Sequence, residues 1–313
     1  MCIRFCAASR LELNSSEFLA SPEQAQPLRF VRPYTIPFSL AFMASLRHRA
    51  RGFYHWMAGD IGLDLRRLLL WPLGLTWFVR DLVRFRRSFS GRLRLRPALS
   101  DRREAAGTAS GEYFLQDLHV TQRIAENAPV RHVDVGSKVD SFVAHVASFR
   151  PIEVVDIRPL KTSARNILFV QADLAASSGS PIGLADSVSC LHTLEHIGLG
   201  RYGDPVDAGS YEAAFASLAA MVAPGGRLFL STPVGVPVVH FNSHRIFAPG
   251  EIVRLASLSG LQLDRLVSIH DGRAVVPHAD PVAGVSALAP LEYALAIFEF
   301  VRPSTPQPSA AAT

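Results

Sequence analysis

Residues 133–140 read VDVGSKVD, and they give the clearest indication of the fold. A short apolar run ends at Asp134 and Gly136, and a helix-forming sequence follows Ser137. Glycine allows a sharp turn and a close approach to a ligand, while the start of a helix offers free backbone amides. The stretch therefore predicts a strand, a turn and a helix, with a ligand beside the turn. Taken alone, a purely structural turn explains it equally well.

Strand-like and helix-like segments alternate on both sides of this turn. Before it, helical periodicity over residues 112–127 places Phe114, Leu118 and Ile124 on one side. After it, the alternation predicts an α/β fold with a Rossmann-like, doubly wound, mostly parallel sheet. No clear helix separates the last two strands, so we expect them to pair antiparallel at an edge. The predicted strands span residues 130–136, 152–157, 166–173, 187–192, 226–233, 263–270 and 293–301, and the helices between them end near 148 or span 208–222 and 249–259.

Acidic residues end the second and third predicted strands. Asp156 closes the second, where a carboxylate can accept both hydroxyls of a ribose. Asp173 follows the third and can meet the amine of an adenine ring, with Leu174 against the ring. Because ligands of open α/β sheets bind outside the carboxyl ends of the strands, Asp134, Asp156 and Asp173 predict one nucleoside-sized cleft. Each acid alone can also be a helix cap.

Five segments together resemble the class I S-adenosylmethionine-dependent methyltransferases: VDVGS, VVDIRP, FVQADL, SVSCLHTLEHI and MVAPGGRLFLSTP. More narrowly, GEYFLQDL, SCLHTLEHIGLGRYGDPVD, FNSHRIF and AIFEF look like an uncharacterised methyltransferase-like family over residues 96–302. The resemblance implies a seven-stranded sheet and S-adenosyl-L-methionine as the cofactor. Matched by position, the cofactor-binding residues are Asp134, Gly136, Ser137, Asp156, Asp173, Leu174, His192 and Glu195.

The first motif departs from the pattern of that superfamily. Two further glycines are usual after Gly136, and Ser137 and Lys138 stand in their place. Two functions therefore stay open. One is methyl transfer to a small-molecule or glycan acceptor, and the other is a non-catalytic methyltransferase-like module docked to a membrane or partner protein.

The loop GLGRYGDPVD (residues 198–207) follows the fourth predicted strand and is expected to form the acceptor wall. Histidine is a suitable general base near neutral pH, so His196, and after it His244, are the predicted catalytic residues. Arg201 and Arg245 can hold an anionic acceptor. The predicted substrate-binding residues are Arg201, Tyr202, Asp204, His240 and Arg245. Ordinary structural roles in packing and capping are the alternative for each.

Two other chemistries fit the sequence less well. His192, Glu195 and His196 match the H-x-x-E-H pattern of zinc peptidases, but that pattern needs a helix, and here it directly follows a strand. We therefore predict no metal site. Glycosyl transfer from a nucleotide sugar lacks the expected paired acids, with Asp204 and Asp207 as the nearest candidates.

Positive charge is concentrated ahead of this domain. The whole chain carries +5, yet residues 47–103 hold fourteen arginines and four acids, a balance of +10. Within residues 61–90, Trp71, Trp77 and Phe78 lie between arginine clusters, which suits a lipid headgroup layer. The uncharged run is only about twelve residues, and Pro72 and Gly74 are expected to break any single helix, so we predict no membrane span. A helical lid over the main domain is the alternative, and nucleic acid is not expected as a partner.

These patterns predict four regions: a poorly ordered N-terminus (1–45), a basic helical, membrane-interfacial segment (46–105), a methyltransferase-like domain (106–302) and a disordered tail (303–313). Translation can start at Met1 or Met43. The chain has three cysteines, too few for a disulfide framework, which favours a reducing compartment. We therefore expect a cytoplasmic protein, peripheral at the inner membrane face.

Overall fold

The computed structural model describes residues 62, 64–100, 102, 105–175 and 182–304. The predictions for residues 1–45, for the start codon and for residues 305–313 lie outside these. The chain forms two compact units, Met1–Glu104 and Ala105–Thr313.

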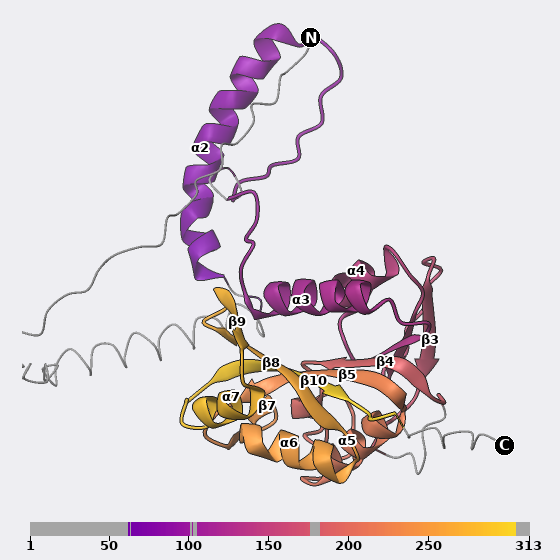
Figure 1. Ribbon diagram of the computed structural model, residues 1–313. Helices are drawn as coiled ribbons and strands as arrows, with labels where there is room; N and C mark the ends of the chain where they lie inside the picture. The colour runs from indigo at the N-terminus through magenta and orange to yellow at the C-terminus, as the bar shows by residue number, and fades with distance from the viewer. Residues whose placement is uncertain (1–61, 63, 101, 103–104, 176–181, 305–313) are drawn as a thin grey trace, which may run out of the picture. The chain divides into compact units, whose positions relative to one another are not determined.

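The second unit is built on one eight-stranded sheet in the order β3-β2-β1-β4-β5-β10-β8-β9 (Figure 1). Neighbours from β3 to β5 are parallel, and β10 pairs antiparallel with both β5 and β8. The predicted Rossmann-like, mostly parallel α/β fold is therefore confirmed, with one strand more than the seven expected. The strands are β1 (His132–Val135), β2 (Ile152–Asp156), β3 (Ile167–Gln171), β4 (Ala185–Leu191), β5 (Val222–Val234), β8 (Gln262–His270), β9 (Ala274–His278) and β10 (Ala294–Val301).

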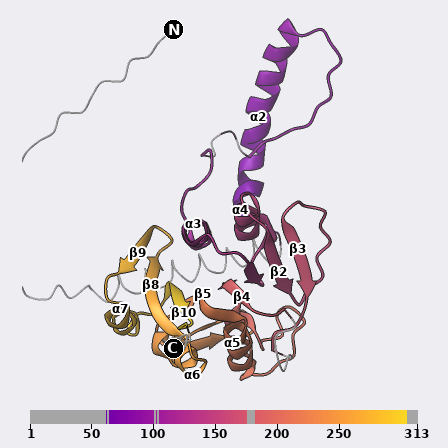
Figure 2. The ribbon, with the colours of Figure 1, turned by 45° about the vertical axis from the view of Figure 1, so that its right-hand side comes forward.

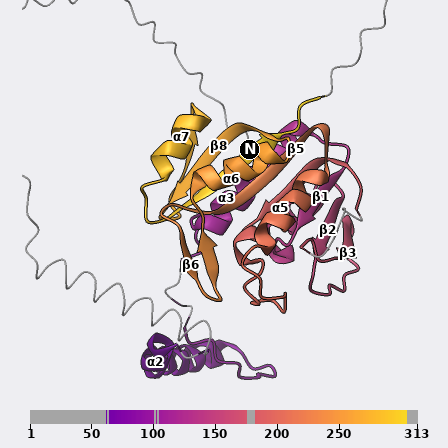
Figure 3. The same ribbon diagram turned by 90° about the horizontal axis from the view of Figure 1, so that it is seen from below.

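Helices cover both faces of this sheet. On one face lie α3 (Glu112–Asn127), the π-helical turn η1 (Val139–Val143) and α4 (Ala144–Ala147), as Figure 2 shows. On the other lie α5 (Ser210–Ala220), α6 (Pro249–Leu258) and α7 (Pro281–Leu288), which are in front of the sheet in Figure 3. Two buried apolar clusters fill the layers between sheet and helices. The strand order reverses between β1 and β4, which is where ligands of such sheets bind.

The order of the last strands differs from the prediction. β8 and β10 are antiparallel as expected, but β10 lies between β5 and β8, and β9 takes the edge. α7 separates β8 from β10 along the chain. A small hairpin, β6 (Val238–His240) and β7 (His244–Ile246), was also not predicted.

The buried side of α3 differs from the prediction as well. Phe114 and Leu118 are 39% and 42% exposed, whereas Gln116 and Asp117 are buried beside Val120 and Ile124. Periodicity assigns apolar residues to the inner side. Here two polar side chains take that side, because they hydrogen bond to each other and Gln116 also accepts from Ser231.

The first unit contains one long helix, α2 (Leu65–Ser88), which runs through Pro72 and Gly74. The prediction that these residues break the helix was wrong. Proline removes one hydrogen bond, but its fixed φ is helical. Gly74 is buried against the returning chain, where an added Cβ would lie 2.6 Å from the carbonyl oxygen of Leu99. Among the described helices, none is long and apolar enough to cross a lipid bilayer.

Candidate functional site

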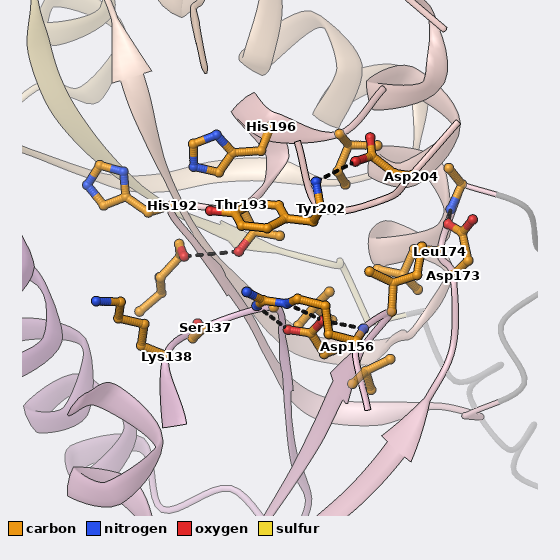
Figure 4. A pocket seen from close by; sticks show the side chains of 18 of the residues that line it. Ser137, Lys138, Asp156, Asp173, Leu174, His192, Thr193, His196, Tyr202 and Asp204 are labelled. Atoms are coloured by element: carbon orange, nitrogen blue, oxygen red, sulfur yellow. Dashed lines mark hydrogen bonds and ion pairs between the residues drawn. The ribbon is translucent and has the colours of Figure 1, made fainter. Parts of the chain in front are cut away.

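A cavity of about 350 Å³ lies at the carboxyl ends of the central strands. Its wall includes the turn after β1, the end of β2, the loop after β3 and the loop after β4 (Figure 4). α3 adds Tyr113, Gln116 and Asp117. Of the predicted residues, the lining includes Gly136, Ser137, Asp156, Asp173, Leu174, His192, His196, Tyr202 and Asp204.

Gly136 forms the tight turn that the sequence predicted. Its φ is +74°, a left-handed conformation that favours glycine. An added Cβ would lie 2.4 Å from Cγ2 of Thr193, and the amide of Gly136 donates to the carbonyl of Val155 at 2.8 Å. The turn therefore connects β1, β2 and the loop after β4, and only glycine fits it.

Asp134 organises this turn from below and does not line the cavity. Its buried carboxylate accepts hydrogen bonds from the hydroxyl of Ser137 at 2.8 Å and from the hydroxyl of Ser189 at 2.6 Å. Ser189 continues the network to the buried ring of His132. Burial raises the pKa of Asp134 to about 7. The oxygens of Asp134 thus face protein donors, and its predicted role toward a cofactor stays a prediction.

Asp156 lies at the end of β2, where a ribose carboxylate was predicted. It accepts from Nε of Arg158 at 2.9 Å and from a terminal guanidinium nitrogen of Arg158 at 2.6 Å. The same guanidinium lies 4.6 Å above the ring centre of Tyr202. Arg158 thus links the β2 end of the cavity to the loop after β4.

Asp173 and Leu174 follow β3 on the far side of the cavity from His192 (Figure 4). The carboxylate of Asp173 accepts from the amide of Ala175 at 2.9 Å, which shapes this loop. Leu174 is 5% exposed and presents an apolar surface. An apolar side chain beside a carboxylate suits a flat, polar-edged ring.

His192 begins the loop after β4 in a left-handed conformation, with φ +50°. Its Nδ1 lies 2.8 Å from Oε1 of Glu195, and its ring lies 4.5 Å from that of Tyr113. Glu195 is wholly buried and does not line the cavity. The carboxylate of Glu195 thus orients the ring of His192, and its contact with a ligand stays a prediction.

His196 also lines the cavity. Its Nδ1 donates to the carbonyl of Ser243 at 2.6 Å, and its Nε2 lies 4.0 Å from Oε1 of Glu195. Burial lowers the pKa of His196, against the opposing charge of Glu195. His196 is therefore a neutral imidazole near pH 7.

Asp204 holds the glycine-rich loop in shape. Its carboxylate accepts from the amides of Gly198, Gly200 and Tyr202 at 2.7, 3.3 and 3.2 Å. Burial opposes ionisation of Asp204, but these amides outweigh it and lower its pKa. The loop thereby holds the ring of Tyr202 over the cavity (Figure 4).

Besides Asp134 and Glu195, four predicted residues lie outside the cavity lining: Arg201, His240, His244 and Arg245. His240 and His244 face each other across the β6–β7 hairpin. Arg245 is 5% exposed and donates to the carbonyls of Ile197 and Ala208 at 2.6 and 3.3 Å. Its guanidinium therefore connects the two ends of the loop after β4, and its contact with an acceptor stays a prediction.

The lining also includes four residues that were not predicted as site residues: Tyr113, Gln116, Asp117 and Arg158. Gln116 and Asp117 carried a usable signal, because polar residues at positions that share a helix face with Val120 and Ile124 are unusual unless a site needs them. Burial raises the pKa of Asp117.

The zinc-peptidase pattern does not form a metal site. Leu194–His196 is a single 3₁₀ turn, and His192 and His196 direct their Nδ1 atoms to Glu195 and Ser243. Within the described part of the chain, no group of three or more potential ligands is placed to hold a metal ion.

Residues 167–264 match the model of an uncharacterised family, described as "Caenorhabditis protein of unknown function, DUF268". The sequence has no significant match among curated proteins.

Several solved structures are similar to this chain. The [4+2]-cyclase SpnF has 15% identity and a TM-score of 0.44, covering 60% of this chain and 82% of its own. The N-methyltransferase NodS from Bradyrhizobium japonicum, in complex with S-adenosyl-L-homocysteine, has 13% identity and a TM-score of 0.41, covering 62% and 89%. The glycopeptide N-methyltransferase MtfA has 13% identity and a TM-score of 0.43, covering 61% and 97%.

Proposed function

We propose that this protein is an S-adenosylmethionine-dependent methyltransferase acting on a small-molecule or glycan acceptor. One observation carries the proposal. The Gly136 turn, the carboxylate of Asp156 and the Asp173–Leu174 loop converge on one cavity of about 350 Å³ at the strand-order reversal. That is the position and size of a small-molecule site in a doubly wound sheet.

The lining suits a cofactor with a nucleoside and a positive charge. Among the described lining residues, five aspartates outnumber Lys138 and Arg158, which favours a sulfonium. Asp156 would hold the ribose hydroxyls, and Asp173 with Leu174 would hold the adenine. S-adenosylmethionine supplies the reactive methyl group, and the protein has to align an acceptor with it.

Calorimetry on the full chain tests the proposal. S-adenosylmethionine and S-adenosylhomocysteine should both release or absorb measurable heat with one site per chain, and Asp156→Ala should weaken that binding. The absence of heat at millimolar ligand would overturn methyl transfer and leave the non-catalytic module. That alternative depends on Lys138, which stands where the superfamily usually has a glycine. The side chain of Lys138 lines the cavity and lies 6.0 Å from the ring centre of Tyr113, and the cavity remains open beside it.

The acceptor side of the cavity is formed by the loop after β4. The guanidinium groups of Arg158 and Arg201 lie 4.6 and 5.2 Å from the ring centre of Tyr202. This cationic rim supports an anionic acceptor, such as a phosphate- or carboxylate-bearing sugar. His196 is the general base that the sequence suggests for it.

We also propose that α2 attaches the protein to the anionic inner face of a membrane, in the cytoplasm. Leu69, Trp71 and Leu73 in its first half are 77%, 57% and 62% exposed. The second half carries exposed Arg84, Arg86 and Arg87. Apolar side chains followed by cations match the acyl and headgroup layers of an anionic bilayer.

Vesicle flotation tests this attachment. The full chain should float with phosphatidylglycerol-containing vesicles at low salt, and less at high salt or after Trp71→Ser. Flotation should be weak with phosphatidylcholine alone. A chain that stays in the soluble fraction under all of these conditions would favour a helical lid instead.

A further inference from the structure

Building on the proposed methyl transfer, we infer that His192, oriented by Glu195, is the general base that takes the proton of the acceptor. The sequence placed His192 among cofactor-binding residues and His196 as the base. Three features of the loop after β4 favour His192 over His196 as the base: the His192–Glu195 hydrogen bond, the ring nitrogen of His192 that has no partner, and the surroundings of His196.

The hydrogen bond fixes the tautomer of His192. A carboxylate only accepts hydrogen bonds, so Nδ1 of His192 carries the proton that it donates to Oε1 of Glu195 at 2.8 Å. The other nitrogen, Nε2, then bears the lone pair that a base needs. Glu195 is itself 0% exposed, and its second oxygen lies 3.5 Å from the hydroxyl of Thr232. The buried carboxylate of Glu195 therefore fixes the orientation of the His192 ring.

The second nitrogen of His192 lacks a protein partner. Among the described residues, three buried side-chain atoms have no hydrogen-bond partner: Oγ1 of Thr121, Nε of Arg150 and Nε2 of His192. Only His192 of these three residues lines the cavity. A buried polar atom without a partner is energetically unfavourable. A ligand in the cavity that donates to Nε2 would remove this cost.

The ring of His192 is also held from the side and from the backbone. Its side chain is only 8% exposed, and its ring contacts that of Tyr113 at a tilt of 33°, with ring centres 4.5 Å apart. The backbone φ of +50° is uncommon for histidine and directs the side chain out of the strand. Fixed geometry of this kind is what a base in a methyl transfer requires.

His196 fits the same role less well. Its Nδ1 donates to the carbonyl of Ser243 at 2.6 Å, and its Nε2 lies 4.0 Å from Oε1 of Glu195. Nδ1 is therefore hydrogen bonded to the protein, and Nε2 lies near a carboxylate oxygen, at a distance longer than a hydrogen bond. A lone pair on Nε2 would face the negative charge of Glu195 and not an acceptor proton.

The proton and electron balance is simple. The acceptor oxygen or nitrogen forms a bond to the methyl carbon as the carbon–sulfur bond breaks, and that electron pair stays on sulfur. The acceptor proton moves to Nε2 of His192. The resulting imidazolium is neutralised by Glu195 through the Nδ1 hydrogen bond, and it returns the proton to water after product release.

Nitrogen-15 NMR of histidine-labelled full chain tests the tautomer at neutral pH. His192, assigned by loss of its signals in His192→Asn, should show a protonated Nδ1 and a bare Nε2. Asparagine tolerates φ +50°, so this variant should keep the loop fold. Glu195→Asp should keep the tautomer, and Glu195→Ala should lose it. A proton on Nε2, or on both nitrogens, would overturn the inference.

Calorimetry and a methyl-transfer assay distinguish a failure of the base role of His192 from a failure of the proposed methyl transfer. His192→Asn should bind S-adenosylmethionine within about twofold of the parent chain, whereas a cofactor ligand would lose about tenfold or more. With labelled cofactor and a panel of sugar phosphates and uronic acids as probes, transfer should fall at least about 100-fold. Loss of cofactor binding in the variant, or an unchanged transfer rate, would contradict the base role alone. A parent chain that does not bind the cofactor would instead overturn methyl transfer itself.

Discussion

Arg158 holds the carboxylate of Asp156 in a two-pronged ion pair, with nitrogen–oxygen distances of 2.9 and 2.6 Å. The side chain of Asp156 is 13% exposed and that of Arg158 is 48% exposed. A ribose can reach both oxygens of Asp156 only if this guanidinium moves aside. Arg158 therefore competes with the proposed cofactor for its best anchoring group.

We expect Asp156→Ala to weaken S-adenosylmethionine binding by about tenfold or more, because hydrogen bonds to a charged group are worth about 1.5–3 kcal/mol. Arg158→Ala should instead tighten binding about two- to fivefold, since a half-exposed ion pair is worth about 0.2–1 kcal/mol. Calorimetry measures both. Lys161→Ala, an exposed residue of the same loop, is the control and should have no effect. Weaker binding in Arg158→Ala would mean that Arg158 holds the cofactor.

Gly136→Ala should unfold the turn after β1. The left-handed φ of +74° costs an alanine about 1–2 kcal/mol, and the contact at 2.4 Å with Thr193 adds to it. Gly183→Ala is the matched control, because φ is +72° there and the nearest atom is 3.7 Å away. Urea unfolding should show a clearly larger loss for Gly136→Ala than for Gly183→Ala.

A double variant separates the two causes. Thr193→Ala removes the Oγ1 and Cγ2 atoms that the new Cβ would meet, so Gly136→Ala/Thr193→Ala should recover much of the difference. Equal losses in the free energy of unfolding for Gly136→Ala and Gly183→Ala would show that a Cβ fits beside Thr193. Only the left-handed φ would then favour glycine at position 136.

The sequence predicted best what depends on the order of the chain. Gly136, Asp156 and Asp173 follow successive parallel strands, and parallel strands bring their carboxyl ends to one edge. Their convergence on the cavity therefore follows from strand prediction alone. The ion pair of Asp156 with Arg158 does not, because it depends on the rotamer of a surface arginine.

The role of Arg245 could not be predicted for a different reason. In a strand, successive side chains alternate between faces, so in β7 Arg245 points inward while His244 points outward. The β6–β7 hairpin is short and was not expected, so this alternation could not be applied. The buried side of α3 was also misassigned, because buried helix positions were assumed to be apolar. Gln116 and Asp117 occupy that side because they line the cavity and not the apolar core.

Asp134 and His132 should give opposite pH dependences of stability. Burial raises the pKa of Asp134 to about 7, so its contribution is full below its unfolded value of 3.8 and is lost as pH rises towards 7. Burial lowers the pKa of His132 to about 3, so its contribution is full above 6.5 and is lost as pH falls. Between about pH 4 and 6.5 the two slopes cancel.

Single variants remove this cancellation. Over that range, the free energy of unfolding of Asp134→Asn should rise with pH, relative to the parent, by about 1.4 kcal/mol per unit. That of His132→Gln should fall by a similar amount. Urea unfolding at several pH values measures both. Parallel pH profiles for the parent and both variants would mean that neither group keeps its shifted pKa.

Arg245→Ala should destabilise the fold and not act on the acceptor. Its guanidinium donates to the carbonyls of Ile197 and Ala208 at 2.6 and 3.3 Å, and Arg245 itself is 5% exposed, so its removal loses both hydrogen bonds and the packing of a buried side chain. We expect a loss of about 3 kcal/mol in the free energy of unfolding. Arg201→Ala is the matched control: Arg201 is exposed on the loop after β4, to which Arg245 donates, and its loss should change stability by less than about 0.5 kcal/mol.

Cofactor affinity completes the comparison. At temperatures where Arg245→Ala is still folded, it should bind S-adenosylmethionine more weakly than the parent chain. Arg245 donates to the carbonyl of Ile197, and this contact positions the segment that carries His192 and His196 along one wall of the cavity. Arg201→Ala should keep that affinity and lose affinity only for an anionic acceptor. If Arg245→Ala is as stable as the parent and loses only the acceptor, the guanidinium faces the substrate, as the sequence first suggested.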